Sequence, residues 1–214
     1  MAVRSLTRSG IKGGRSLAAA GIKAGRNLAR TTANSLGKYI SMLAGISADD
    51  HVLIQSITVG AGGTPSVTFA SIPQGYRSLE LRVSAQSAGT DNALFLRMNG
   101  DSGTNYSRHR LFGNGTGVGS DSSVSDTSIT PIAQIASSAY TSVVAAAVIE
   151  ILDYASSSKF KTARALSGWD GNGSGWIQLA SGAWQSLSPV TSLVLQLASA
   201  NIAQGSRFDL YGVK

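Results

Sequence analysis

The stretch Leu79-Glu-Leu-Arg-Val83 decides the fold class, because apolar and charged residues alternate through it without a break. Successive side chains of a β-strand point to opposite faces, so this alternation predicts a strand with one buried and one solvent-facing side. The stretch Leu94-Phe-Leu-Arg-Met98 repeats the pattern and runs into Asn99-Gly100, a pair that favours a tight turn. Both stretches therefore indicate half-buried strands.

Eight further segments are short, apolar or β-branched, and bounded by Gly, Ser, Asn or Pro. They are residues 52–58, 67–69, 106–112, 141–152, 160–166, 176–180, 193–197 and 208–213. The alanine-rich segment 141–152 also fits a helix, but Val143, Val144, Val148, Ile149 and Ile151 favour a buried strand. About ten strands without intervening helical repeats predict a mainly β protein, an antiparallel β-sandwich or jelly roll.

The N-terminus repeats itself with a period of 11 residues. Arg4-Ser-Leu-Thr-Arg-Ser-Gly-Ile-Lys-Gly-Gly14 is followed by Arg15-Ser-Leu-Ala-Ala-Ala-Gly-Ile-Lys-Ala-Gly25, and a degraded third copy begins at Arg26. Eleven residues are close to three helical turns. We therefore expect residues 1–48 to form a basic helical arm and residues 49–214 to form the β body.

Five glycines in the repeat each cost about 1 kcal/mol relative to alanine in a helix, so the arm needs a partner surface to order it. A disordered basic tail and an organellar transit peptide are the alternatives. The positions expected to carry anchoring and assembly are Arg4, Leu6, Arg8, Ile11, Lys12, Arg15, Leu17, Ile22, Lys23, Arg26, Leu28 and Arg30.

Charge is divided unevenly between the arm and the body. Residues 1–50 carry eight Lys or Arg and two acids, whereas residues 51–214 carry ten and nine. The near-neutral body argues against a nucleic-acid-binding domain. No aromatic residue that could stack on bases precedes Tyr39. We expect another protein, rather than nucleic acid or a membrane, to receive the arm.

The candidate chemical motifs favour a protein without a catalytic, cofactor or metal site. The chain has no cysteine and no uncharged apolar run of about 18 residues. His109 lies between Arg108 and Arg110 without a nucleophile elbow, which favours an exposed or interface histidine. The glycines of 113–119 match neither phosphate-loop template.

Two other features have structural explanations. Residues 99–105 and 170–175 place oxygen side chains beside glycines but lack the ligand spacing of a calcium loop, so Asx turns are expected. Trp169, Trp176 and Trp184 are expected to pack in the core or against a neighbouring subunit, with a carbohydrate platform as the alternative.

Residues 113–128 are rich in Gly, Ser and Asp and are predicted to form a surface loop. Loops carried by a rigid scaffold are where receptor contacts concentrate. The residues expected to take part in recognition there are Asn114, Thr116, Asp121 and Asp126.

Several segments carry a resemblance to a known group. They are Ser71-Ile-Pro-Gln-Gly-Tyr-Arg-Ser-Leu-Glu-Leu-Arg-Val83, Phe95-Leu-Arg-Met-Asn-Gly-Asp101 with Asn105-Tyr-Ser107, Leu111-Phe-Gly-Asn-Gly115, Ile151-Leu-Asp-Tyr-Ala155 and Phe208-Asp-Leu-Tyr-Gly-Val-Lys214. Over about residues 52–214 the chain resembles small structural proteins of tailed bacteriophages, common in phages of cyanobacteria and other aquatic bacteria. The resemblance implies a virion surface protein, often a fibre or decoration component, and no catalytic residues. The repeated arm is not part of that pattern.

These observations predict a non-enzymatic phage virion protein, a tail fibre or receptor-binding appendage component whose arm binds other virion proteins. A capsid decoration protein or head fibre is the alternative, and a carbohydrate-binding module is a further one. The body is expected to contact a host-surface glycan or protein. We expect a homotrimer, since fibres of that kind use three-fold assemblies, incorporated into the virion in the bacterial cytoplasm.

Overall fold

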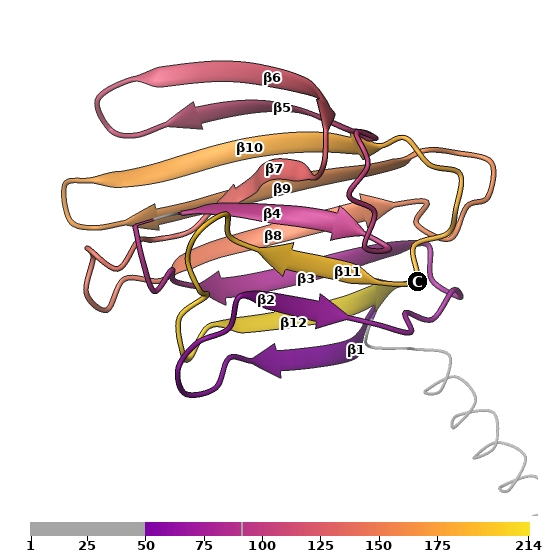
Figure 1. The fold of residues 1–214 in the computed structure, drawn as a ribbon, viewed down its shortest axis with the longest axis horizontal. Coiled ribbons are helices and arrows are strands. Elements are labelled where there is room, and N and C mark those ends of the chain that lie inside the picture. Colours follow the sequence, from indigo (N-terminus) through magenta and orange to yellow (C-terminus); the bar gives the residue numbers. More distant parts are fainter. Residues whose placement is uncertain (1–49, 91) are drawn as a thin grey trace, which may run out of the picture. The chain divides into compact units, whose positions relative to one another are not determined.

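The computed structural model describes residues 50–90 and 92–214, and these residues form twelve β-strands and no helix (Figure 1). All neighbouring strands within the two sheets pair antiparallel. The mainly β, antiparallel prediction is confirmed. The helical arm expected over residues 1–48 lies outside the described residues.

The strands form one sheet of eight and one of four. The order in the larger sheet is β1 (His51–Thr58), β12 (Arg207–Val213), β3 (Ser78–Ala85), β8 (Ala145–Leu152), β9 (Lys161–Asp170), β10 (Gly175–Trp184), β5 (Tyr106–Gly113) and β6 (Val118–Asp126). The order in the smaller sheet is β2 (Ser66–Phe69), β11 (Leu193–Gln196), β4 (Ala93–Met98) and β7 (Ile129–Gln134).

The core lies between the two sheets and follows the alternation of the sequence. On β3 the side chains of Leu79, Leu81 and Val83 are buried, whereas Arg82 is exposed. Leu94, Leu96 and Met98 of β4 and Leu193 and Leu195 of β11 supply part of the opposite wall. Burying an aliphatic side chain of this size contributes about 1.5–3 kcal/mol, so the period-2 pattern drives the two sheets together.

Residues 145–152 of the alanine-rich segment 141–152 form strand β8, as predicted, rather than a helix, whereas residues 141–144 precede the strand and include a turn. Ala145, Ala147, Ile149 and Ile151 face the core, and Val148 on the other side is exposed. The small alanine side chains allow the sheets to approach closely at this point. The strand is therefore buried on one face only.

The predicted loop over residues 113–128 is wrong for most of its length, because residues 118–126 form the edge strand β6. Serine, glycine and aspartate have low strand propensity, but backbone pairing with β5 overrides it. Strand β7 was also not predicted; it contains Pro131, which an edge strand such as β7 tolerates.

The described body has two distinct ends along the strand direction. At one end the backbone N–H of Lys214 donates a hydrogen bond to the carbonyl of Asp50 at 3.0 Å, so the first and last described residues are neighbours. Strands β5 and β10 turn at the opposite end, through residues 114–117 and 171–174. Figure 1 shows the C-terminus at the right and both hairpin turns at the left.

Candidate recognition site at two hairpin tips

Two hairpins, β9–β10 and β5–β6, widen the larger sheet. Strand β7 closes the smaller sheet and packs against β9 and β10, so β6 extends past the smaller sheet (Figure 1). The two hairpin turns lie side by side because β10 pairs with β5. They lie at the end of the strands opposite to Asp50 and Lys214.

The tip of the β5–β6 hairpin is organised by Asn114. Its side-chain oxygen accepts hydrogen bonds from the backbone N–H groups of Thr116 and Gly117 at 3.1 and 3.0 Å, and from the Thr116 hydroxyl at 2.9 Å. An Asx side chain that binds its own turn in this way fixes a tight loop. Two of the four predicted recognition residues, Asn114 and Thr116, therefore lie at this tip.

The tip of the β9–β10 hairpin is closed by a similar arrangement. The Asp170 carboxylate accepts a hydrogen bond from the backbone N–H of Asn172 at 2.8 Å, and the N–H of Gly171 donates to the carbonyl of Ser174 at 2.7 Å. Asn172 and Gly173 both have positive φ, which the turn requires. The Asx turn expected at residues 170–175 is confirmed.

A shallow cleft of about 620 Å³ lies between the two tips. Its walls are residues 113 and 115–118 on one side and residues 169, 170 and 173–177 on the other. Thr116, Asp170 and Ser174 provide hydroxyl and carboxylate groups there, beside the glycine backbone and the indoles of Trp169 and Trp176. These groups suit a hydroxylated or peptide ligand held by hydrogen bonds.

The tryptophans do not form one exposed platform. Trp176 stacks on Phe112 with ring centroids 4.8 Å apart, and Trp169 lies against Tyr140 at 4.5 Å. Trp184 is buried and its indole N–H donates to the Asp101 carboxylate at 2.7 Å. Core packing thus accounts for Trp184, and Trp169 packs against the core in part, whereas Trp169 and Trp176 are half-buried and also line the cleft.

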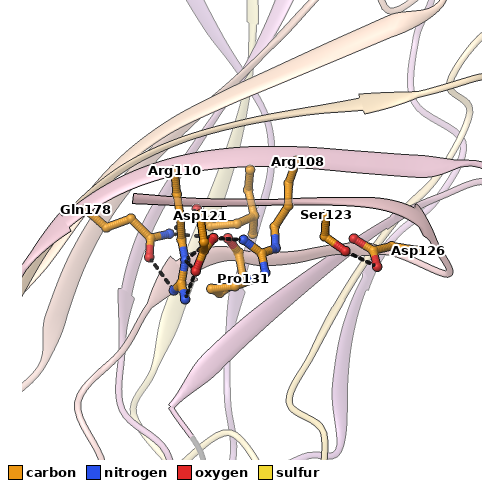
Figure 2. A network of polar contacts seen from close by, with 8 residues as sticks. Arg108, Arg110, Asp121, Ser123, Asp126, Pro131 and Gln178 are labelled. Atoms are coloured by element: carbon orange, nitrogen blue, oxygen red, sulfur yellow. Dashed lines mark hydrogen bonds and ion pairs between the residues drawn. The ribbon is translucent and has the colours of Figure 1, made fainter. Parts of the chain in front are cut away.

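The other two predicted recognition residues do not belong to the tip. Asp121 and Asp126 lie on β6 and face the same side of the sheet as Arg108 and Arg110 of β5 (Figure 2). The Arg110 guanidinium donates to Asp121 at 2.7–2.9 Å, and Arg108 also pairs with Asp121. The expectation that the four residues share one recognition loop is wrong.

Asp121 is held by this network as a structural carboxylate. The hydrogen bonds from Arg110, together with those from Arg108, lower the pKa of Asp121 to about 2. Arg110 also reaches the side-chain oxygen of Gln178 at 3.2 Å, and Gln178 donates to the Pro131 carbonyl at 3.2 Å. The network therefore joins β6 and β5 to β10 and β7.

Asp126 has a local role as well. One of its carboxylate oxygens accepts a hydrogen bond from the Ser123 hydroxyl at 2.7 Å, which stabilises the end of β6 where the pairing with β5 is irregular. Part of this pairing was visible in the sequence, because Arg108 and Arg110 occupy alternate positions and therefore share one side of a strand. That Asp121 is their partner follows only from the register of β5 and β6.

The described residues hold no group of three His, Asp or Glu side chains that could bind a metal ion together. His109 is exposed on the face of β5 opposite to Arg108 and Arg110. Asp101, in the segment compared with calcium loops, accepts hydrogen bonds from Trp184, Asn105 and the N–H of Gly103. Those three donors lower the pKa of Asp101, with Trp184 making the largest contribution, so an Asx turn accounts for this loop.

No helix among the described residues is long and apolar enough to cross a membrane. The twelve positions expected to anchor the arm, Arg4 to Arg30, lie outside the described residues.

Comparison with known proteins gives no family for the chain. No protein-family model matches the sequence, and no curated protein matches it significantly.

Proposed function

We propose that the chain is a non-enzymatic virion structural protein of a tailed phage, in which residues 1–48 bind another virion protein and the β body is displayed outward. The observation that carries the proposal is that the two ends of the body differ. Asp50, where the arm continues, lies at one end of the strands, and the cleft between the hairpin tips lies at the other. This arrangement suits a body that is attached by one end and recognises its target with the other.

The strand order supports the same proposal. Without the hairpins β5–β6 and β9–β10, the remaining strands form the sheets β1-β12-β3-β8 and β2-β11-β4-β7. We infer that this is the order of an eight-stranded jelly roll, an architecture found in viral capsid and lectin domains among others. Because one fold serves many functions, the strand order alone does not decide the function.

Within this proposal, a tail fibre or receptor-binding appendage ranks ahead of a capsid decoration protein or head fibre. The reason is the cleft, which offers Thr116, Asp170 and Ser174 for contact with a host-surface glycan or protein. A decoration protein would need no such cleft at its outer end.

The test is the composition of purified virus particles. We expect an antibody against residues 50–214 to label the particles in electron micrographs, at the tail for a fibre and over the whole head for a decoration protein. Copy number separates the two, since tens of copies indicate the tail and hundreds indicate the capsid. Absence of the chain from purified particles would overturn the proposal, and normal incorporation of a chain without residues 1–48 would overturn the anchoring role of the arm.

A further inference from the structure

The larger sheet exposes an apolar surface on the side that faces away from the smaller sheet. Its six aliphatic side chains have exposed fractions between 46% and 93%. We call these residues the apolar face: Val148, Leu166, Leu179, Leu111, Ile177 and Val118. The four on β8, β9 and β10 alternate along their strands with buried residues, and the strand register places Leu111 and Val118 on the same side of β5 and β6, so all six point to one side of the sheet.

Strand register makes the apolar face continuous. Val148, Leu166, Leu179 and Leu111 are successive partners across β8, β9, β10 and β5. The next row is Ala146, Gly168, Ile177, Gly113 and Val118. Two hollows of about 610 and 670 Å³ run along these rows. Monomeric soluble proteins seldom expose a contiguous apolar patch of more than about 300–600 Å².

Most carboxylates beside the apolar face are already paired. Glu150 lies 2.6 Å from the guanidinium of Arg164, and Glu80 lies 2.7 Å from that of Arg82. Asp170, which lines one hollow, accepts a hydrogen bond from the N–H of Asn172, so the many basic residues of 4–30 would find little unpaired negative charge there. An occupant that brings neither an excess of acids nor an excess of bases fits better, and the body itself is such an occupant.

The size of the surface also suits a second copy. Five adjacent strands, β8, β9, β10, β5 and β6, contribute eight to ten residues each. At about 4.8 Å between strands and about 3.4 Å per residue, they make a face of roughly 24 Å by 27 Å. A standard protein interface needs about 800 Å² of accessible surface per partner, which a corrugated face of these dimensions approaches.

We propose that the apolar face packs against the same face of a second copy of the chain, about a two-fold axis that runs along the strands between β9 and β10. Such an axis places each row of residues opposite the same row of the second copy, with the order of the strands reversed. Leu166 then faces Leu179 of the second copy, and the pairs Val148 with Leu111, Ile177 with Gly168, and Glu150 with His109 follow from the register.

These pairs are complementary in size and polarity. A leucine meets a leucine at the axis, the larger Ile177 meets a glycine, and a carboxylate meets an imidazole at the polar border. In a two-fold interface residue i contacts residue j and j contacts i, as this arrangement requires. The packing resembles that of two sheets in a sandwich, which lie about 10 Å apart.

The proposed interface predicts a dimer. It does not depend on the virion function, and it replaces the trimer expected from the arm and the phage resemblance. A mass of twice 22.0 kDa for the full chain in solution is therefore expected, and a mass of three times that value would overturn the proposal.

The test compares two substitutions at leucines of equal exposure. Leu166 in the apolar face and Leu187 in a loop outside it are each 52% exposed. Leu166→Glu should convert the dimer into a monomer, with self-association at least tenfold weaker by analytical ultracentrifugation, whereas Leu187→Glu should leave the mass unchanged. Circular dichroism checks that both variants are folded.

Three outcomes would overturn the proposal: a monomeric wild-type chain, an unchanged mass for Leu166→Glu, or an equal loss of association in both variants. A second variant decides the case if Leu166→Glu does not fold. The chain has no cysteine, so Leu179→Cys introduces a single thiol beside the axis. A short bismaleimide should cross-link this variant into dimers and should not cross-link Leu187→Cys; the reverse result contradicts the face-to-face arrangement.

Discussion

Asp121 is the side chain that joins the edge strand β6 to the rest of the larger sheet. It accepts hydrogen bonds from two arginines of β5, and its own strand is otherwise made largely of serine and glycine. Glycine and serine contribute little packing energy, so much of the side-chain interaction that holds β6 comes from this charged network. The side chain of Asp121 is 35% exposed, and solvent therefore weakens its ion pairs.

The substitution Asp121→Asn should destabilise the protein by about 1 kcal/mol, because two largely buried guanidinium groups lose their counterion. Denaturant unfolding at neutral pH measures the change. Asp153→Asn is the matched control, since the pair between Asp153 and Lys159 is more than half exposed on both sides and should contribute almost nothing. Equal effects of the two substitutions would contradict the role of Asp121.

The same carboxylate gives a pH dependence of defined sign. The pKa of Asp121 is lowered from 3.8 to about 2 in the folded protein. Its contribution is therefore fully present above about pH 4 and is lost as the pH falls toward 2. The difference in stability between the wild type and Asp121→Asn should shrink over that interval.

Gly212 leaves room for the aromatic ring of Tyr76 beside β12. A Cβ atom on Gly212 would lie 2.3–2.5 Å from ring atoms of Tyr76, so the tyrosine ring lies directly on the glycine backbone. The Tyr154 hydroxyl donates to the carbonyl of Pro73 and accepts from the N–H of Tyr76. Residues 73–76, Tyr154 and Gly212 thus converge at one place, where they position β12 and β3.

Gly212→Ala should lower the stability by about 1–3 kcal/mol, because the ring of Tyr76 has to move out of its position. Differential scanning calorimetry measures the effect as a lower Tm. Gly60→Ala is the control, since a Cβ at Gly60 meets nothing within 4 Å and its φ is not positive. An unchanged Tm for Gly212→Ala would show that Tyr76 does not need the contact.

At the scale of the elements, the strands predicted from sequence were those in which burial alternates along the chain. β3 and β4 are clear cases, because each places three large apolar residues in the core. β6 was missed because its inward positions are polar or glycine and only Val118 and Val124 among its outward positions are apolar, so no alternation with a buried apolar side marks the strand. β7 was missed because it is nearly continuously buried, with Pro131 in its middle.

Less of the candidate recognition site than of the strands could be predicted from the sequence. Asn114 and Thr116 could be identified from turn chemistry, which is local in sequence. The partners of Asp121, and the cleft between residues 113–118 and 169–177, depend on which strands are neighbours. The two hairpin tips are neighbours because β10 pairs with β5, which is distant in sequence, and no local sequence pattern predicts this pairing.

The edge position of β6 predicts its hydrogen exchange. β6 pairs with β5 alone, whereas β8 and β9 each have two neighbouring strands. Amides of β6 should therefore exchange through local opening, with a free energy below that of global unfolding, and those of β8 and β9 only through global unfolding. Native-state hydrogen exchange with increasing denaturant checks this, and equal protection of β6 and β9 would contradict it.

At the scale of the whole molecule, the two ends of the strands and the flank of the larger sheet present different surfaces of the described body. The strand ends carry Asp50 and Lys214 on one side and the hairpin tips on the other, while the apolar face lies on the flank of the larger sheet. Attachment would use a different surface from recognition and self-association, whereas Val118 and Ile177 belong both to the apolar face and to the wall of the cleft. A second copy packed on the apolar face would therefore lie against that wall of the cleft.

The hydrogen bond between Lys214 and Asp50 makes the body suitable for circular permutation. Because Asp50 and Lys214 are neighbours, a linker of a few glycines could join them into a circle once residues 1–49 are removed. Cutting that circle between Gly115 and Thr116, where no strand is interrupted, would give a circular permutant with the same sheets and new ends at the opposite side. A cargo fused to those ends would be carried beside the cleft between the hairpin tips.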